Sequence, residues 1–293
     1  MGFLGIDVGG TFIKVVKKDN TSFIQDKIRI EDCHKSHQGF TDTLIDIIQK
    51  YKPLKVGIAV AGLVDKSGRI TSSPNLKYVE NLNLKAILES TSGISTLVGN
   101  DANLATYGEY VYGNGKGSKI LICLTLGTGL GGGVVVEGKI LEGVSGCGME
   151  VGHMIVEKDG ELCSCGRRGC LEAYVSSYGL EKIYTKLSNK FLSSFDIIKS
   201  AKRGEKRAIE SFEVLVDYFS IGVMNLVHIF NPDRILLSGG IVENYPDLVE
   251  KVKLKVKSMA FPLPASILEI GVGSLGSWSG AYGALAFAEN YSS

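Results

Sequence analysis

Four side chains that bind transition metals lie close together near the middle of the chain. His153, Cys163, Cys165 and Cys170 fall within eighteen residues of the segment EVGHMIVEKDGELCSCGRRGCLE at 150–172. A tetrahedral Zn2+ ion is bound by four Cys and His donors that converge from a short, turn-rich segment. Glycines between the cysteines permit the tight turns that this convergence requires. The sequence therefore predicts a structural zinc site of three cysteines and one histidine.

Two other interpretations of these cysteines stay open: ordinary buried thiols, or a disulfide between two of them. Their Gly, Arg and Ser neighbours make a polar setting for core thiols. Coordination by four protein ligands leaves no position for water, so we expect zinc to shape a loop and not to act as a Lewis acid. A histidine that binds a metal through one ring nitrogen presents the other to a second partner.

Length and composition set the frame in which this site must be held. At 293 residues the chain exceeds the usual size of one domain, which predicts two lobes, with a boundary in the polar run GNGKGSK at 113–119. The 32 basic and 31 acidic residues give a net charge of +1, so no field draws the chain to nucleic acid or to a membrane. We see no signal peptide and no uninterrupted apolar run of membrane-spanning length. Six cysteines indicate reduced thiols and a cytoplasmic location.

A glycine turn opens the chain. The segment FLGIDVGGTFIKVVKKDN at 3–20 predicts two strands joined by a tight turn. Bare glycine amides, a hydroxyl and a lysine can cradle phosphate, while a carboxylate holds the accompanying Mg2+. An ordinary Gly-Gly hairpin accounts for the same pattern. The residues concerned are Asp7, Gly9, Gly10, Thr11 and Lys14.

A second glycine turn repeats this design in KILICLTLGTGLGGGVVVEGKILEG at 119–143. So many glycines cost folding entropy, and a ligand that approaches the backbone closely explains them. Two such hairpins amount to an internal duplication in outline, with a nucleotide phosphate chain held between them. The residues concerned are Gly127, Thr128 and Gly129.

An acid stands where a strand gives way to a helix. We expect a strand at 95–99, a turn at Asn100 and Asp101, and a helix from about Ala102. A carboxylate at the end of a strand is well placed as a general base for a substrate hydroxyl. A plain N-cap is the competing interpretation, since Asn and Asp are preferred there. Asn75, in a polar loop, either binds a ligand or caps a turn.

The remaining elements are read from apolar spacing. Helices are expected at 40–51, near Leu84 and at 208–230, and His228 on the last of these is expected to be a packed core histidine. A buried strand at 55–65 ends in Gly62. The segment RILLSGGI predicts a strand followed by Gly239 and Gly240, and a closing helix ends the chain.

This combination resembles the ROK family of sugar kinases, within the actin-like ATPase superfamily, over nearly the whole chain. The motifs that carry the resemblance are DVGGT at 7–11, AGLVD at 61–65, GND at 99–101, LGTGLGGG at 126–133, EVGH at 150–153, CSCGRRGCLE at 163–172 and NPDRILLSGG at 231–240. The resemblance implies a two-lobed α/β fold of the ribonuclease H-like type, with duplicated mixed sheets and an interlobe cleft. It assigns 1–117 and the closing helix 278–293 to the first lobe, and 118–277 with the zinc knuckle to the second.

The resemblance also implies roles for individual residues. Asp101 looks like the catalytic base. The side chains implied to hold sugar hydroxyls are Asn100, Glu150, His153 and Glu172, and we count Gly62 and Asn75 with them as substrate-binding residues. Asp7 would steady Mg2+, and Gly239 and Gly240 would lie beside adenine and ribose. The phosphates of ATP would be surrounded by Thr11, Lys14, Thr128 and Gly129. Glu150 and Glu172 can also be solvated surface acids.

The expected activity is ATP-dependent phosphorylation of a hexose, glucose to glucose 6-phosphate. Kinases for N-acetylmannosamine, fructose or allose are alternatives, because Val79 and Met149 depart from the family pattern beside the expected sugar pocket. Sugar-sensing regulators of the family carry a DNA-binding module ahead of the DxGGT strand, whereas six residues precede Asp7 here. A pseudokinase that only binds is a further alternative. The family often forms dimers, which implies a homodimer.

Overall fold

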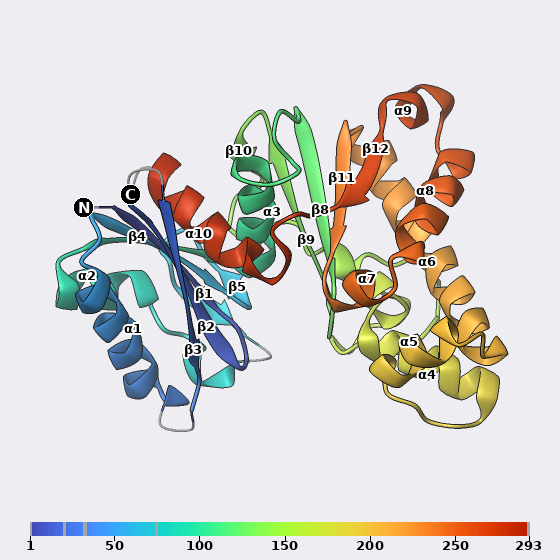
Figure 1. The fold of residues 1–293 in the computed structure, drawn as a ribbon, viewed down its shortest axis with the longest axis horizontal. Helices are drawn as coiled ribbons and strands as arrows, with labels where there is room; N and C mark the ends of the chain where they lie inside the picture. Colours follow the sequence, from blue (N-terminus) through green and yellow to red (C-terminus); the bar gives the residue numbers. More distant parts are fainter. Residues whose placement is uncertain (1, 20–21, 32–33, 74–75, 292–293) are drawn as a thin grey trace. The chain divides into compact units, whose positions relative to one another are not determined.

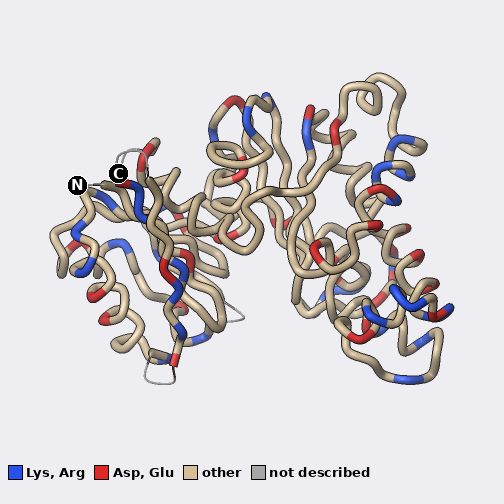
Figure 2. Tube along the Cα trace, viewed as in Figure 1, with Lys and Arg blue, Asp and Glu red and all other residues tan. Residues whose placement is uncertain are grey.

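The computed structural model describes residues 2–19, 22–31, 34–73 and 76–291 and confirms the α/β class. The chain divides by its contacts into two compact units (Figure 1). Unit 1 comprises Met1–Gly117, Gly133–Met149 and Ser274–Ser293, and unit 2 comprises Ser118–Gly132 and Glu150–Gly273. Residues 133–149 and 274–277 thus belong to unit 1 by their contacts. Figure 2 shows Lys and Arg mixed with Asp and Glu within each unit.

The strands are β1 Phe3–Val8, β2 Phe12–Asp19, β3 Ser22–Arg29, β4 Lys55–Val60, β5 Leu63–Val64, β6 Ile70–Ser72, β7 Ser95–Asn100, β8 Ile120–Leu126, β9 Leu130–Val136, β10 Lys139–Ile140, β11 Arg234–Ser238 and β12 Glu269–Val272. The α-helices are α1 His37–Tyr51, α2 Leu84–Ser92, α3 Asp101–Val111, α4 Ser177–Ser188, α5 Ser194–Lys202, α6 Lys206–Phe230, α7 Gly240–Asn244, α8 Asp247–Met259, α9 Pro262–Ile267 and α10 Ser279–Asn290. Short 3-10 helices are η2 Lys77–Val79, η3 Val151–His153, η4 Leu171–Ala173 and η5 Gly276–Trp278.

The first sheet has the strand order β3-β2-β1-β4-β7 and is mixed, because β1 is antiparallel to β2 and parallel to β4. Side chains alternate between the two faces of a strand. Leu4, Ile6 and Val8 of β1 therefore point to one face, where they share a core with α1 and α2. Gly5 and Asp7 point to the other face, toward α10. The alternation thus carries Asp7 to the α10 side of the sheet.

Helix α10 lies unusually close to this sheet. A Cβ atom on Gly5 would lie 2.2 Å from the carbonyl oxygen of Ala281, and one on Gly57 would lie 1.9 Å from that of Ala284. Because backbone atoms cannot yield to such contacts, both strand positions need glycine. The helix also packs against α3 through Gly283. In Figure 1 the red helix accordingly lies against the blue strands.

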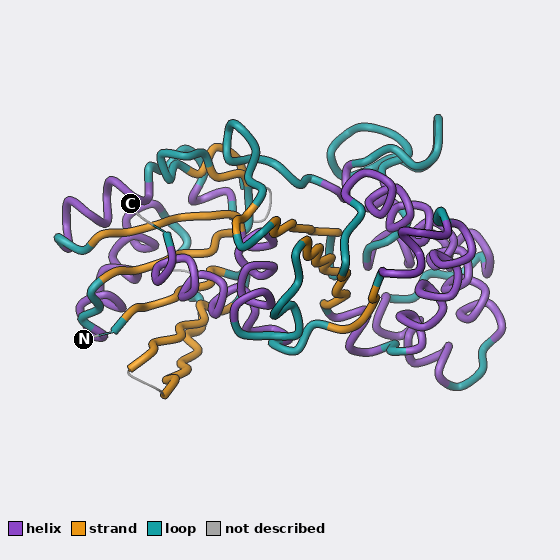
Figure 3. Tube along the Cα trace, turned by 90° about the horizontal axis from the view of Figure 1, so that it is seen from above, coloured by secondary structure: helices purple, strands orange, loops and turns teal. Residues whose placement is uncertain are grey.

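The second sheet has the order β10-β9-β8-β11-β12, with β8, β11 and β12 parallel. Helix α6 packs against α4, α5 and α8 and buries a stripe of residues that includes Phe212, Leu215, Phe219 and Val223. Figure 3 shows the helices (purple) that gather in this part of the chain. The strands and turns that carry the metal-binding and glycine-rich segments precede them.

Among the described residues, α6 is the one helix long and apolar enough to cross a membrane by length and composition, with half of its most apolar window buried. The sequence expectation concerned uninterrupted apolar runs, and Glu213 and Asp217 interrupt this helix. One such helix is weak evidence for a span, since core helices pass the same test.

The expectation for His228 is wrong. This histidine lies in the last turn of α6 and is exposed, as is its neighbour Ile229 at 66%. Its ring stacks on Phe261 at a centroid distance of 4.7 Å, and its Nε2 accepts a hydrogen bond from the Phe261 amide at 3.3 Å. The buried stripe of α6 ends at Val227, so apolar spacing extrapolated one residue too far.

Candidate active site

The four predicted metal ligands converge in unit 2. One donor atom from each of His153, Cys163, Cys165 and Cys170 lies within 4.8 Å of the others. The sulfur of Cys163 lies 3.7 Å from His153 Nδ1, and the sulfurs of Cys165 and Cys170 lie 3.7 Å apart. Two sulfurs bound at about 2.3 Å to a tetrahedral ion would be separated by about 3.8 Å. The donor set and its spacing therefore fit a zinc ion.

The three clustered cysteines are free thiols, which disposes of the disulfide alternative in this structure. Glycines shape the loop that holds them. Gly166 and Gly169 have φ angles of 84° and 76°, in the left-handed region that favours glycine. A Cβ atom on Gly169 would lie 1.7 Å from the carbonyl oxygen of Glu157, so no other residue fits there. The loop is closed by the Gly169 amide, which donates to Glu161 O at 2.8 Å.

The imidazole of His153 faces two ways. Its Nδ1 is directed at the Cys163 sulfur, while its Nε2 lies 3.9 Å from Glu150 Oε2. The side chains of His153 and Glu150 are 26% and 48% exposed, so solutes can reach the pair. Burial raises the pKa of the Glu150 carboxyl, the nearby His153 opposes this, and the Glu172 carboxylate adds to it. The pair offers one ring nitrogen and one carboxylate to a polar ligand.

Glu172 occupies a buried position between the metal-binding loop and the glycine turn that joins β8 and β9. Its Oε2 accepts a hydrogen bond from the Leu130 amide at 2.9 Å. Its Oε1 accepts from the hydroxyls of Ser164 at 2.8 Å and Tyr178 at 3.1 Å. The glycine turn itself is tight, since the Gly127 amide donates to Gly129 O at 3.0 Å. Thr128, at its tip, is exposed.

The first glycine turn joins β1 and β2 in unit 1. The Gly9 amide donates to Phe12 O at 3.1 Å, and Gly10 and Thr11 are exposed. Burial raises the pKa of Asp7 from 3.8 to about 6, although the neighbouring Lys14 ammonium lowers it. Lys14 donates to the carbonyl oxygen of Ser277. A carboxylate that is costly to ionise in this setting would gain from a divalent cation beside it, which fits the predicted Mg2+.

Asp101 begins α3, and the cap of this helix is its neighbour. Asn100 accepts a hydrogen bond from the Asn103 amide at 3.0 Å through Oδ1 and donates to Gly62 O at 2.9 Å through Nδ2. Asp101 accepts from the Ala102 amide at 2.9 Å. Gly62, at a φ of 139°, lies so close to Ser72 O that a Cβ atom would be 2.3 Å from it. The competing cap interpretation therefore applies to Asn100 and not to Asp101.

Gly239 and Gly240 follow β11 as predicted. Gly239 has a φ of 94°, and a Cβ atom on it would lie 2.4 Å from Leu126 O, whereas Gly240 has open space around its Cα. Gly240 begins α7. Asn75 lies outside the described residues. Val79 is fully buried, and Met149 adopts a φ of 72°, which is uncommon for a residue other than glycine.

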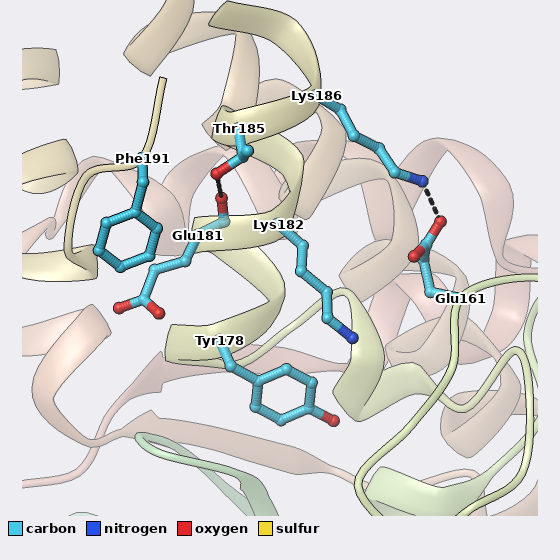
Figure 4. Close-up of a pocket in the computed structure, with 7 residues that line it drawn as sticks. All are labelled: Glu161, Tyr178, Glu181, Lys182, Thr185, Lys186 and Phe191. Carbon is cyan, nitrogen blue, oxygen red and sulfur yellow. Dashed lines mark hydrogen bonds and ion pairs between the residues drawn. The ribbon is translucent and has the colours of Figure 1, made fainter. Parts of the chain in front are cut away.

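A pocket of about 450 Å³ lies on unit 2 beside the metal-binding loop (Figure 4). Its lining residues are Glu161, Tyr178, Glu181, Lys182, Thr185, Lys186 and Phe191. None of the predicted site residues is among them. Tyr178 is shared between the two regions, since its hydroxyl donates to Glu172 and its ring lines the pocket.

The sequence profile of the ROK family matches residues 3–291. The chain belongs to the ROK family. It is 30% identical to a glucokinase of Thermotoga maritima, over 96% of this chain and 95% of that protein. It is 32% identical to a xylose repressor of Bacillus spizizenii, over 96% of this chain and 75% of the repressor. A ROK glucokinase of Streptomyces griseus, solved with glucose and AMPPNP, superposes with a TM-score of 0.82 at 27% identity, over 99% of this chain and 100% of that chain.

Family membership and the actin-like ATPase fold confirm the resemblance inferred from the motifs. The sequence reasoning missed three residues that support the candidate site: Ser164, Tyr178 and Gly280. Ser164 lies between the predicted ligands Cys163 and Cys165, and this position could have indicated its role. Tyr178 and Gly280 lie in helical segments without a motif of their own, and only the fold brings them to Glu172 and Asp7.

Proposed function

We propose that this ROK protein transfers the γ-phosphoryl group of ATP to a hexose hydroxyl, with glucose as the first candidate and glucose 6-phosphate as the product. The observation that carries the proposal is the imidazole of His153, whose Nδ1 lies 3.7 Å from the Cys163 sulfur and whose Nε2 lies 3.9 Å from Glu150 Oε2. This arrangement presents polar groups suited to vicinal hydroxyls. The glucokinase of Thermotoga maritima and the glucose-bound structure from Streptomyces griseus support the same substrate class.

In the proposed reaction Asp101 accepts the proton of the attacking hydroxyl. An alcohol is a poor nucleophile near neutral pH, so a carboxylate must take its proton as the new phosphorus–oxygen bond forms. Asn100 supplies the cap of α3, and Asp101 stands at the start of that helix, partly exposed. In the proposed complex the sugar is bound by Asn100, Glu150, His153 and Glu172, together with Gly62 and Asn75.

The nucleotide is assigned to the glycine turns. In unit 1 the Mg2+ ion would be held by Asp7, and the phosphates would be surrounded by Gly9, Gly10, Thr11 and Lys14. In unit 2 the phosphates would contact Gly127, Thr128 and Gly129. Adenine and ribose would lie beside Gly239 and Gly240. When bound, Mg2+ neutralises charge on the phosphate oxygens. A zinc ion held by the four-residue cluster would order the loop that carries His153.

A panel of sugars with Mg-ATP and a coupled assay of ADP release tests this proposal. Glucose, N-acetylmannosamine, fructose and allose belong to the panel, because the sugar is the least determined part. With the preferred sugar, Asp101→Asn should lower kcat by about 10²- to 10⁴-fold, since a positioned base contributes that much. Sugar binding by calorimetry should persist in this variant. Near-full turnover by Asp101→Asn would refute the assignment of the base.

The similarity to the xylose repressor favours a second candidate, a sugar-binding regulator without kinase activity. The same panel separates the two functions. A regulator or a pseudokinase would bind a sugar, as measured by calorimetry, and would release no ADP above the level of the Asp101→Asn variant. We also propose a homodimer, which sedimentation equilibrium would test.

A further inference from the structure

Met149 has a backbone conformation that none of the usual causes explains. Among the described residues, seven residues other than glycine have a positive φ angle. Three of them end α-helices, one lies in the two-residue turn between β9 and β10, and two are an Asn and an Asp, which tolerate this region. In this order they are Lys52, Asn189, Asn231, Glu137, Asn81 and Asp159. The seventh is Met149, with a φ of 72°.

This conformation is unfavourable for methionine. In the left-handed region the Cβ atom of an L-residue lies too close to the following carbonyl oxygen. A residue keeps such a conformation only where the surrounding structure imposes it, and such residues gather at functional sites. Met149 directly precedes Glu150, whose Oε2 lies 3.9 Å from His153 Nε2. The strained residue is therefore adjacent to an acid of the candidate site.

The residues before Met149 are fixed within unit 1. The Gly148 amide donates to Glu142 O at 2.9 Å, which closes a short loop. This loop is seated closely on β5, because a Cβ atom on Gly146 would lie 2.7 Å from the carbonyl oxygen of Val64. Backbone atoms do not yield to such contacts, so the path of the chain into Met149 is set.

The residues after Met149 are fixed within unit 2. The His153 amide donates to Glu150 O at 3.0 Å and forms the turn η3. A Cβ atom on Gly152 would lie 2.3 Å from Leu130 O, so this turn is also seated closely. Glu150 itself has a φ of −72° and a ψ of 54°, close to the angles of an inverse γ-turn. Two unusual conformations in succession thus turn the chain where the Glu150 side chain leaves it.

We propose that Met149 is a positioning residue, whose left-handed backbone conformation directs the Glu150 carboxylate toward His153 and the substrate. The orientation of Glu150 then depends on the φ angle at position 149 and not on a contact between the Met149 side chain and the sugar. The part that concerns the sugar rests on the proposed function. The conformation of position 149 stands without it.

A matched pair of variants, Met149→Asn and Met149→Thr, separates these two causes. Asn and Thr are similar in size and polarity, but Asn tolerates the left-handed region and β-branched Thr does not. Met149→Asn should raise Tm by about 2–4 °C and leave the Kd for glucose, measured by calorimetry, within about twofold of wild type. Met149→Thr should lower Tm by about as much and raise the Kd for glucose about tenfold, because the left-handed conformation must then be formed on binding. The Kd for ADP should be unchanged in both.

Glu137→Thr is the control, because it imposes the same conflict in the exposed β9–β10 turn. It should lower Tm and leave the Kd for glucose unchanged. The proposal is overturned if Met149→Asn weakens glucose binding about tenfold, since the side chain itself would then be required, and this arm suffices if Met149→Thr folds poorly. A lower Tm for Met149→Asn than for wild type, measured without ligand, would also overturn it. Absence of glucose binding by the wild type would refute the proposed substrate alone.

Discussion

The two glycine turns look alike in sequence and differ in what holds them. In the β1–β2 turn the carboxylate comes from the hairpin itself, since Asp7 lies on β1, two residues before Gly9. In the β8–β9 turn the carboxylate comes from Glu172, far along the chain. Each carboxylate is seated against a glycine: a Cβ atom on Gly280 would lie 2.7 Å from Asp7 Cγ, and one on Gly129 would lie 2.5 Å from Glu172 Oε2.

This difference decides what each turn depends on. The first turn depends on the packing of α10 against β1, which places Gly280 beside Asp7. The second depends on the metal-binding loop, because Glu172 follows Cys170 by two residues and is oriented by Ser164. The two turns therefore share a backbone motif but are held in place by different parts of the chain. The predictions below perturb one support at a time.

Loss of the proposed metal site should have the largest effect and should spare the first turn. Cys170→Ser replaces a fully buried side chain of the proposed zinc cluster, and structural zinc binding contributes folding free energy directly. We expect a loss on the order of 5 kcal/mol in the free energy of unfolding of unit 2. Hydrogen–deuterium exchange should accelerate at 127–131 and at 160–172 and stay unchanged at 8–12. Cys147→Ser, outside the cluster, is the control, and equal acceleration at both turns would contradict the comparison.

Gly129→Ala should cost about 2–3 kcal/mol of unfolding free energy. Its Cβ atom meets the Glu172 carboxylate, and moving that carboxylate breaks its hydrogen bonds with Leu130, Ser164 or Tyr178. Gly127→Ala is the matched control within the same turn, since nothing lies within 4 Å of its Cβ position. That variant should change stability by less than about 0.5 kcal/mol. Chemical denaturation of both proteins would measure the difference, and equal losses would show that the turn as a whole resists substitution.

The sequence predicts those parts of the candidate site whose interacting residues lie close together in the sequence. The convergence of His153, Cys163, Cys165 and Cys170 was predicted because four possible donors and their glycines lie in one short segment. Both glycine turns and their flanking strands were found for the same reason. The sequence motif at 99–101 placed the strand-to-helix junction within one residue of its position in the structure.

Contacts between distant segments could not be found in this way. The partner of Glu172 is the backbone amide of Leu130, which has no side-chain signature, and Tyr178 is one of 12 tyrosines. The cap at Asn100 was missed because Asn and Asp stand side by side and both suit that position. The exposure of His228, whose ring stacks on Phe261, follows from the end of the buried stripe of α6 at Val227. These are properties of packing, which periodicity alone does not specify.

Gly280→Ala tests the support of the first turn and should cost about 1–2 kcal/mol. The added Cβ atom would lie 2.7–2.9 Å from the Asp7 carboxyl group, which is short and has little freedom on a strand. The higher helix propensity of alanine offsets part of this cost, by up to about 1 kcal/mol. Gly10→Ala, with open space at its Cβ position, is the control. Exchange should accelerate at 8–12 and not at 127–131, the reverse of the pattern expected for Cys170→Ser.

Asp7→Asn should stabilise the unliganded protein at neutral pH, by about 1 kcal/mol. Burial raises the pKa of Asp7 from 3.8 to about 6, so between these values the folded protein binds more protons than the unfolded chain. Stability therefore falls as pH rises from about 4 to 6, and the cost of the ionised carboxylate is complete above that range. A shift of this size corresponds to about 3 kcal/mol, reduced here because the side chain is partly exposed. Asn removes the ionisation and hence the pH dependence.

Thermal unfolding of wild type and Asp7→Asn between pH 4 and 8, without nucleotide, measures this difference. The two curves should coincide near pH 4 and separate as Asp7 ionises. Asp65→Asn provides a control of opposite sign, because hydrogen bonds from Ser67 lower the pKa of Asp65, so its carboxylate stabilises the fold above its usual pKa. A destabilised Asp7→Asn at pH 7 would show that the carboxylate of the first turn, like Glu172 in the second, is held by favourable contacts. In that case the two turns would differ only in the origin of their carboxylates.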